Sequence, residues 1–149
     1  MDVERSRDAF DAMGRIASGW RRRASAGLKL FGITLAQYEL ISQARRRGGL
    51  SPSAAAAELA WDRPTLTVVA RTCLARGWLK RGQSSQDKRS VRIELTGKGE
   101  EILDRIEGAL PFAGRAFGTP FDVIGAEERT ELFRLLDRVS RRAADLWGR

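Results

Sequence analysis

Apolar residues recur at helical spacing along most of this 149-residue chain. Positions three and four residues apart, the spacing of one helix face, predict helices over residues 3–24, 34–47, 51–59, 62–77, 96–110 and from 125 onward. After Gly77 the period changes to two, with a short strand at 78–82 and strict alternation at 90–95 that places Val91, Ile93 and Leu95 on one side. The predicted fold is therefore mainly α, with one small antiparallel pair of strands.

Polar capping residues mark where several of these helices begin. The residues placed to accept a hydrogen bond from the first helical turn are Thr34, Ser51, Asp62 and Thr96. Residues 26–33 contain two glycines and are expected to form a loop or a bent helix. Pro111 is expected to kink or end the helix before it, and residues 111–125 to form an irregular connection.

The helix that begins near Asp62 has two different faces. Its buried stripe is predicted to be Leu66, Val69, Ala70 and Cys73, and the opposite side carries Pro64, Thr67, Val68, Arg71 and Thr72. A solvated face normally carries Glu and Lys, whereas this one is small, polar and cationic. Together with the helix from Ser51 it is typical of a helix-turn-helix, whose second helix enters the DNA major groove.

The loop between the two predicted strands reads GQSSQDKRS. It is too long and too polar for a tight hairpin turn, so it is expected to project as a wing that carries Lys88 and Arg89. Near the N-terminus, Arg21, Arg22 and Arg23 close the first helix. This basic run suits the negative end of the helix dipole, and the alternative is a contact with DNA phosphate.

The positive charge is concentrated in one part of the chain. The net charge is +8, and residues 34–99 hold 12 basic and five acidic side chains, whereas residues 100–149 hold eight basic and ten acidic ones. A general preference for arginine on solvated faces would not leave the last third negative. The distribution therefore favours a nucleic-acid-binding segment over a generic compositional bias.

Composition also excludes several classes of protein. The chain has one cysteine, Cys73, and no histidine, so we expect no metal, no cofactor and no histidine-dependent catalysis. It also lacks a glycine-rich phosphate loop, and we expect it not to be an enzyme. No apolar run approaches the roughly 18 residues of a membrane span and no signal peptide is visible, so a cytoplasmic protein without membrane contact is expected.

The segments PTLTVVARTCLARGWLKR and QDKRSVRIELTGKGEEIL resemble the recognition helix, wing and following helix of the MarR family of winged-helix transcriptional regulators. The family's Asp-x-Arg pair in the wing is matched by Asp87 and Arg89. The resemblance implies that this carboxylate orients the guanidinium and that the arginine reaches into the minor groove. The irregular stretch 111–125 departs from the family, whose fifth helix is usually long.

The resemblance implies three parts: a dimerisation helix at residues 1–33, a winged helix-turn-helix at 34–96, and C-terminal dimerisation helices at 97–149. A homodimer of this kind would read a pseudo-palindromic operator in double-stranded DNA. The residues expected at the DNA are Arg63, Arg81 and Lys88 for phosphates, Thr65, Thr67, Val68 and Arg71 for bases, Pro64 beside them, and Asp87 and Arg89 in the wing.

The family further implies control by a small aromatic effector, and a repressor that the effector releases. Trp20, Phe31 and Tyr38 are the residues expected to line its site, and the simpler interpretation is that they are core aromatics. A different class of function is a winged-helix protein-interaction module that does not bind specific DNA. The Thr and Arg side chains on the predicted recognition helix argue against that alternative.

Overall fold

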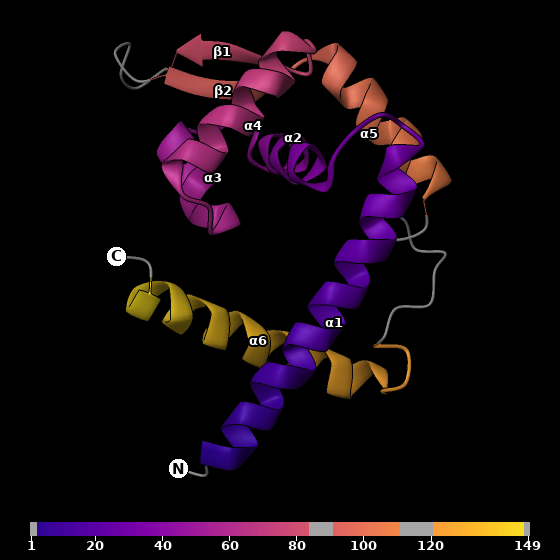
Figure 1. Cartoon of the computed structure of the whole chain (residues 1–149), viewed down its shortest axis with the longest axis vertical. Coiled ribbons are helices and arrows are strands. Elements are labelled where there is room, and N and C mark those ends of the chain that lie inside the picture. The colour runs from indigo at the N-terminus through magenta and orange to yellow at the C-terminus, as the bar shows by residue number, and fades with distance from the viewer. Residues whose placement is uncertain (1–2, 84–90, 111–120, 148–149) are drawn as a thin grey trace.

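A computed structural model describes residues 3–83, 91–110 and 121–147 of the chain (Figure 1). Its elements in chain order are α1 (Val3–Lys29), α2 (Leu35–Arg47), α3 (Pro52–Leu59), α4 (Arg63–Ala75), β1 (Leu79–Gln83), β2 (Val91–Leu95), α5 (Gly97–Ala109) and α6 (Ala126–Trp147). The described elements confirm the predicted fold class, mainly α with one small antiparallel sheet. None of the described helices is long and apolar enough to cross a membrane.

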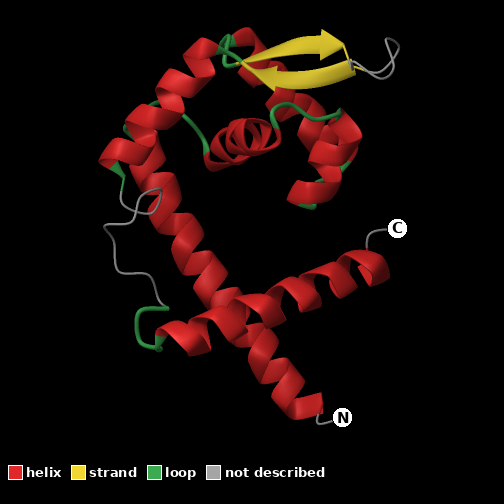
Figure 2. Ribbon diagram, turned by 180° about the vertical axis from the view of Figure 1, so that it is seen from behind, coloured by secondary structure: helices red, strands yellow, loops and turns green. Residues whose placement is uncertain are grey.

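The elements from α2 to α5 gather into one lobe with the two strands at its far end, as Figure 1 shows. Helix α1 runs out of this lobe, and α6 crosses it near its N-terminal half; Figure 2 shows the same crossing from behind. Helices α3, α4 and α5 all pack against α2, which is therefore the centre of the lobe. We define α2 to α5 with both strands as the winged-helix lobe.

The first helix is longer than the sequence indicated. Of the two alternatives expected for residues 26–33, a loop or a bent helix, the first part is helical, because α1 continues to Lys29. Ala24 and Leu28 are fully buried in the core of the lobe, and this burial holds the last turns of α1 helical despite Gly27. The turn comes only at Gly32, whose φ of 66° suits a residue without a side chain.

The core of the winged-helix lobe draws on every helix from α1 to α5. Its members, each with at most a tenth of the side chain exposed, include Leu40 and Ile41 of α2, Leu66 and Cys73 of α4, and Leu103 and Ile106 of α5. Leu66 and Cys73 belong to the buried stripe predicted for their helix. The proposed boundaries at residues 33 and 96 stay a prediction, although α1 and α5 both contribute buried side chains to this core.

The sheet contains more than the predicted hairpin. Strands β1 and β2 pair antiparallel with Leu79 opposite Leu95, and Leu50, before α3, forms a bridge to Ile93 through two hydrogen bonds of 2.9 and 3.0 Å. This short third partner ties the wing to the helix-turn-helix. The alternation predicted for β2 holds for Ile93, which is buried, but Val91 is 47% exposed because nothing described packs over the outer end of the strand.

The four predicted capping residues are all found at helix starts. Thr34 and Gln37 form the full capping box, with bonds of 2.9 and 3.2 Å, and Ser51, Asp62 and Thr96 each accept an N–H from the first turn of their helices. Helix α5 ends at Ala109, two residues before the proline expected to end it. The irregular connection expected at residues 111–125 falls largely outside the described residues.

Candidate nucleic-acid interface

Helix α4 is held so that one face points away from the protein. Leu66 and Cys73 are buried against α2 and α3, and Val69 and Ala70 beside them are half-buried. At its N-terminus the Asp62 carboxylate accepts a hydrogen bond from the Thr65 N–H at 2.7 Å. Hydrogen bonding from the Thr65 side chain, and then from its backbone N–H, lowers the pKa of Asp62, so the cap stays ionised at the positive end of the helix dipole.

The opposite face of α4 is exposed from Arg63 to Arg71, and Thr72 at its end is half-buried. Its exposed residues are Arg63, Pro64, Thr65, Thr67, Val68 and Arg71, all of them predicted DNA contacts. The Thr67 hydroxyl donates to the Arg63 carbonyl at 2.8 Å, and the Thr72 hydroxyl donates to the Val68 carbonyl at 3.0 Å. Because the Thr67 hydrogen is already used, this side chain offers lone pairs and a methyl group to a partner.

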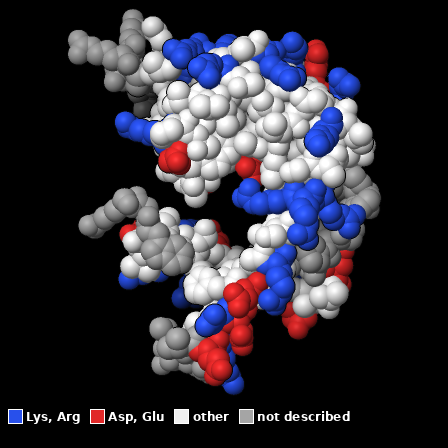
Figure 3. All heavy atoms as spheres, in the orientation of Figure 1, with Lys and Arg blue, Asp and Glu red and all other residues white. Residues whose placement is uncertain are grey.

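Three arginines at this surface are free to meet a partner. Among the interactions that the structure describes, the side chains of Arg63, Arg71 and Arg81 make no hydrogen bond or ion pair, and all three are exposed. Several other arginines of the lobe are paired: the guanidinium of Arg47, for example, lies 2.9 Å from the Glu58 carboxylate. Figure 3 shows Lys and Arg gathered along the edge of the lobe, over the strands and the adjoining helix end.

Thr96 joins the end of α4 to the start of α5. Its hydroxyl donates to the Gly77 carbonyl at 2.6 Å and accepts the Gly99 N–H at 3.1 Å, while its own N–H donates to the Trp78 carbonyl at 3.1 Å. Trp78 is buried between them, with the Arg76 guanidinium 5.0 Å from the ring centre. The C-terminal end of α4, the start of β1 and the start of α5 therefore meet at one hydrogen-bonded joint.

Strand β2 is fixed to the end of α2 by a residue that sequence reasoning missed. Arg92 of β2 donates to the Gly49 carbonyl at 2.5 Å, just after the C-terminus of α2, where a cation suits the helix dipole. On the same face of the sheet, Lys80 and Glu94 form an ion pair at 3.6 Å. The predicted wing residues Asp87, Lys88 and Arg89 lie outside the described residues, between the ends of β1 and β2.

The three residues predicted to line an effector site differ in their surroundings. Phe31 and Tyr38 are half-buried and pack against the core, with the Arg105 guanidinium 6.0 Å from the Phe31 ring centre. Burial raises the pKa of Tyr38. Trp20 on α1 is 40% exposed. Two cavities formed by described residues are lined by other side chains, so the effector assignment of these three stays a prediction.

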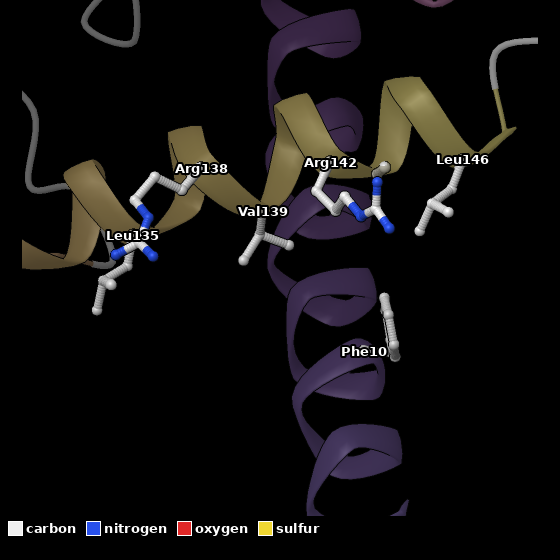
Figure 4. Close-up of a pocket in the computed structure, with 7 residues that line it drawn as sticks. Phe10, Leu135, Arg138, Val139, Arg142 and Leu146 are labelled. Atoms are coloured by element: carbon white, nitrogen blue, oxygen red, sulfur yellow. The ribbon is translucent and has the colours of Figure 1, made fainter. Parts of the chain in front are cut away.

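The first of these cavities is an apolar groove on α6, with a volume of about 420 Å³. Figure 4 shows Leu135, Val139 and Leu146 in a row along α6, with Phe10 of α1 beside them. Each of these four side chains is between 41% and 55% exposed. Arg138 and Arg142 border the row. Within the described residues the apolar row of α6 is thus only partly covered.

The fold and this surface define a winged helix-turn-helix protein, with an exposed cationic recognition helix and a strand pair beside it. A model of the MarR family matches residues 33–91, which run from the start of α2 to the start of β2. The chain belongs to the MarR family of transcriptional regulators.

Among characterised relatives, the HTH-type transcriptional regulator PecS of Dickeya dadantii is 31% identical over 112 residues, covering 73% of this chain and 66% of PecS. The transcriptional repressor MprA of Escherichia coli is 31% identical over 81 residues, covering 53% of this chain and 46% of MprA. The chain thus spans about half to two thirds of the length of these relatives.

Solved structures share the fold across most of the chain. AbfR of Staphylococcus epidermidis superposes with a TM-score of 0.80 at 20% identity, covering 96% of this chain and 95% of AbfR. CouR from Rhodococcus jostii, solved with p-coumaroyl-CoA bound, superposes with a TM-score of 0.79 at 18% identity, covering 90% of this chain and 92% of CouR. A MarR variant from Escherichia coli in complex with operator DNA superposes with a TM-score of 0.70 at 22% identity, covering 87% of this chain and 91% of the MarR chain.

Proposed function

We propose that this protein is a homodimeric, cytoplasmic, sequence-specific DNA-binding repressor. The observation that carries the proposal is the outer face of α4, where Thr67, Val68 and Arg71 are exposed and the cations nearby are unpaired among the described residues. Arg47 of α2, by contrast, has its guanidinium 2.9 Å from the Glu58 carboxylate. The operator complex of the structurally similar MarR variant supports DNA binding by this fold.

The chemistry of this face assigns different tasks to its residues. Arg71 presents a planar fork suited to the O6 and N7 atoms of guanine, and Val68 and the Thr67 methyl suit a thymine methyl. With its hydrogen held by the Arg63 carbonyl, the Thr67 oxygen acts as an acceptor, for which the amino groups of adenine and cytosine are the matching donors. Thr65 and Pro64 lie at the helix start beside these contacts.

Phosphate contacts fall to Arg63, Arg81 and Lys88, which position the protein without reading sequence. In the wing, the Asp87 carboxylate orients Arg89, whose guanidinium enters the minor groove, where a narrow A·T-rich segment attracts it. Arg81 lies on β1 opposite Ile93 of β2, and its side chain is exposed.

The partly covered apolar row on α6 supports the homodimer. Phe10, Leu135, Val139 and Leu146 leave enough apolar surface exposed to need a partner, and a second copy with the same row satisfies a twofold contact. A twofold dimer carries two α4 helices, which read half-sites about one helical turn apart, roughly 34 to 36 Å. The operator is accordingly pseudo-palindromic.

Release from the operator is assigned to a small aromatic effector. The relative MprA is named as a repressor, and the structural neighbour CouR was solved with an aromatic acyl-CoA. Phe31 and Tyr38, at the edge of the core between α1 and α2, and Trp20 further along α1 are the side chains proposed to contact it. Such a ligand releases DNA only if it binds better to a dimer whose recognition helices are wrongly spaced.

Selection of bound duplexes from a random DNA pool tests the proposal, with recovered sites measured again at two salt concentrations. We expect a pseudo-palindrome with half-sites one turn apart and affinity that falls steeply with salt, because several phosphates are neutralised. Arg71→Ala and Arg89→Ala should each weaken operator binding by about 1 to 3 kcal/mol. Arg15→Ala, an exposed arginine on α1, is the matched control and should bind as wild type does.

Two results would contradict the proposal. Enrichment of no sequence, with only weak salt-sensitive binding left, would favour a winged-helix protein-interaction module. Operator affinity unchanged in the Arg89→Ala variant would remove the wing from the interface while leaving the α4 assignment to be decided by Arg71→Ala.

A further inference from the structure

The second described cavity is cationic and lies on α1, with a volume of about 430 Å³. Its lining residues are Arg21, Arg22, Ser25, Ala26 and Lys29, all of them exposed. The positions follow one face of the helix over two turns. Because the two central residues have short side chains and the three outer ones are long, the hollow lies between two arginines on one side and a lysine on the other.

Two of the three positive charges around this cavity have no acidic partner among the described residues. The Arg21 guanidinium lies 3.9 Å from the Glu39 carboxylate, at the outer limit of an ion pair. Among the interactions described for the chain, the side chains of Arg22 and Lys29 make no hydrogen bond or ion pair. Like charges on one helix face repel each other, and an anion between them would turn that repulsion into attraction.

The three arginines at the end of α2, Arg45 to Arg47, are arranged differently from those of α1. In α2 the guanidinium of Arg45 contacts three carboxylates of α5, and that of Arg47 lies 2.9 Å from the Glu58 carboxylate. Those arginines hold helices together. Removing Arg22 or Lys29 would break no described contact, so their role in packing is small.

The position of the cavity separates it from the DNA surface. Helix α1 packs against α2, and Figure 1 places α2 between α1 and the recognition helix. Figure 3 shows Lys and Arg gathered where α1 meets the winged-helix lobe, beside the hollow that separates the lobe from α6. This group lies apart from the basic edge over the strands, so a duplex seated on α4 does not supply its anion.

We propose that the cavity binds the phosphate groups of a small phosphorylated molecule. The guanidinium groups of Arg21 and Arg22 suit bidentate hydrogen bonds to phosphate oxygens. Lys29 supplies a point charge from the other side, and the Ser25 hydroxyl can donate a hydrogen bond to a remaining oxygen. The volume lies within the range of small-molecule sites and exceeds what one phosphate fills. This assignment does not depend on operator recognition.

Calorimetric titration of the full chain with inorganic pyrophosphate tests it, in a low-salt buffer free of phosphate and sulfate. We expect saturable binding, weakened about tenfold or more by Arg22→Ala and by Lys29→Ala, since each removes one charge-assisted hydrogen bond. Lys29→Arg should retain binding. Arg15→Ala removes one charge from the same helix outside the cavity, and its affinity should equal that of wild type.

Each contrary result overturns the proposal in a recognisable way. No saturable heat, or equal weakening in the Arg15→Ala control, would mean that the cavity is only part of a diffuse positive surface. A parallel titration with a 20-base-pair duplex separates the sources of phosphate: if Arg22→Ala and Lys29→Ala weaken duplex binding by the same factor, the cavity is a DNA contact. Pyrophosphate binding without any selected operator would leave this inference standing and refute the proposed regulator.

Discussion

Replacing Gly99 with alanine tests how closely α5 must approach the end of the recognition helix. A Cβ atom at this position would lie 2.3 Å from the Trp78 carbonyl oxygen and 2.5 Å from a methyl carbon of Leu95. Carbon atoms in favourable contact are about 3.5 to 4.0 Å apart, so α5 would have to retreat by roughly 1 Å. That retreat stretches the bonds of Thr96 to the Gly77 and Trp78 carbonyls.

The expected net cost follows from three contributions. Overpacking in a rigid region costs about 1 to 3 kcal/mol. Weakening one buried hydrogen bond of Thr96 adds about 1 kcal/mol. Alanine is a better helix former than glycine by about 1 kcal/mol, which offsets part of this. We expect Gly99→Ala to lower the free energy of unfolding by about 1 to 3 kcal/mol, measured by urea denaturation at fixed protein concentration.

Gly108 offers a matched control in the same helix. A Cβ there meets no atom within 4 Å, so Gly108→Ala should raise the free energy of unfolding by up to about 1 kcal/mol. The two substitutions are chemically identical and are expected to have opposite signs. A Gly99→Ala protein as stable as wild type would show that the joint between α5 and the strands tolerates displacement.

Two further predictions concern side chains in the winged-helix lobe. Arg45→Ala should lower the free energy of unfolding, measured by urea denaturation, by about 1 to 3 kcal/mol, because it leaves three carboxylates of α5 facing one another. The side chain of Arg47 is more exposed, and Arg47→Ala should lower this free energy by under about 1 kcal/mol. Equal losses in the two variants would contradict this prediction. Burial raises the pKa of the Cys73 thiol from 9.0 to about 12, so the folded protein keeps a proton that the unfolded chain releases. The free energy of unfolding should therefore fall more steeply between about pH 9 and 12 in wild type than in Cys73→Ala, and parallel pH profiles would refute the assignment.

Local signals in the sequence were sufficient for the recognition helix. An N-cap acts within three residues and an apolar stripe within one helix, so Asp62, Leu66 and Cys73 could be assigned without knowing what they contact. The exposure of Thr67 and Arg71 followed from the same periodicity. Which bases they meet does not follow, because it depends on where the helix sits relative to the wing.

Features that depend on distant partners could not be predicted. The bridge between Leu50 and Ile93 involves a single residue before α3, which has no periodicity of its own to reveal a strand. Arg45 looked like one of three basic residues at a helix end, and its carboxylate partners lie more than 50 residues away in sequence. The alternation at Val91 shows which side of the strand it occupies, but only packing decides whether that side is covered.

These joints also limit how a signal could reach DNA. Helix α5 is bonded to the end of α4 through Thr96 and to α2 through Arg45, and Leu28 buries the end of α1 in the same core. The winged-helix lobe therefore moves as one body with the last turns of α1.

From Leu28 to Phe10, beside the apolar groove of α6, α1 spans about 27 Å at 1.5 Å per residue. A rotation of about 5° at that groove displaces the lobe by about 2 Å over this length. A base contact tolerates only a few tenths of an ångström, so in the proposed dimer a small change in the packing of α1 against α6 is sufficient to release the operator.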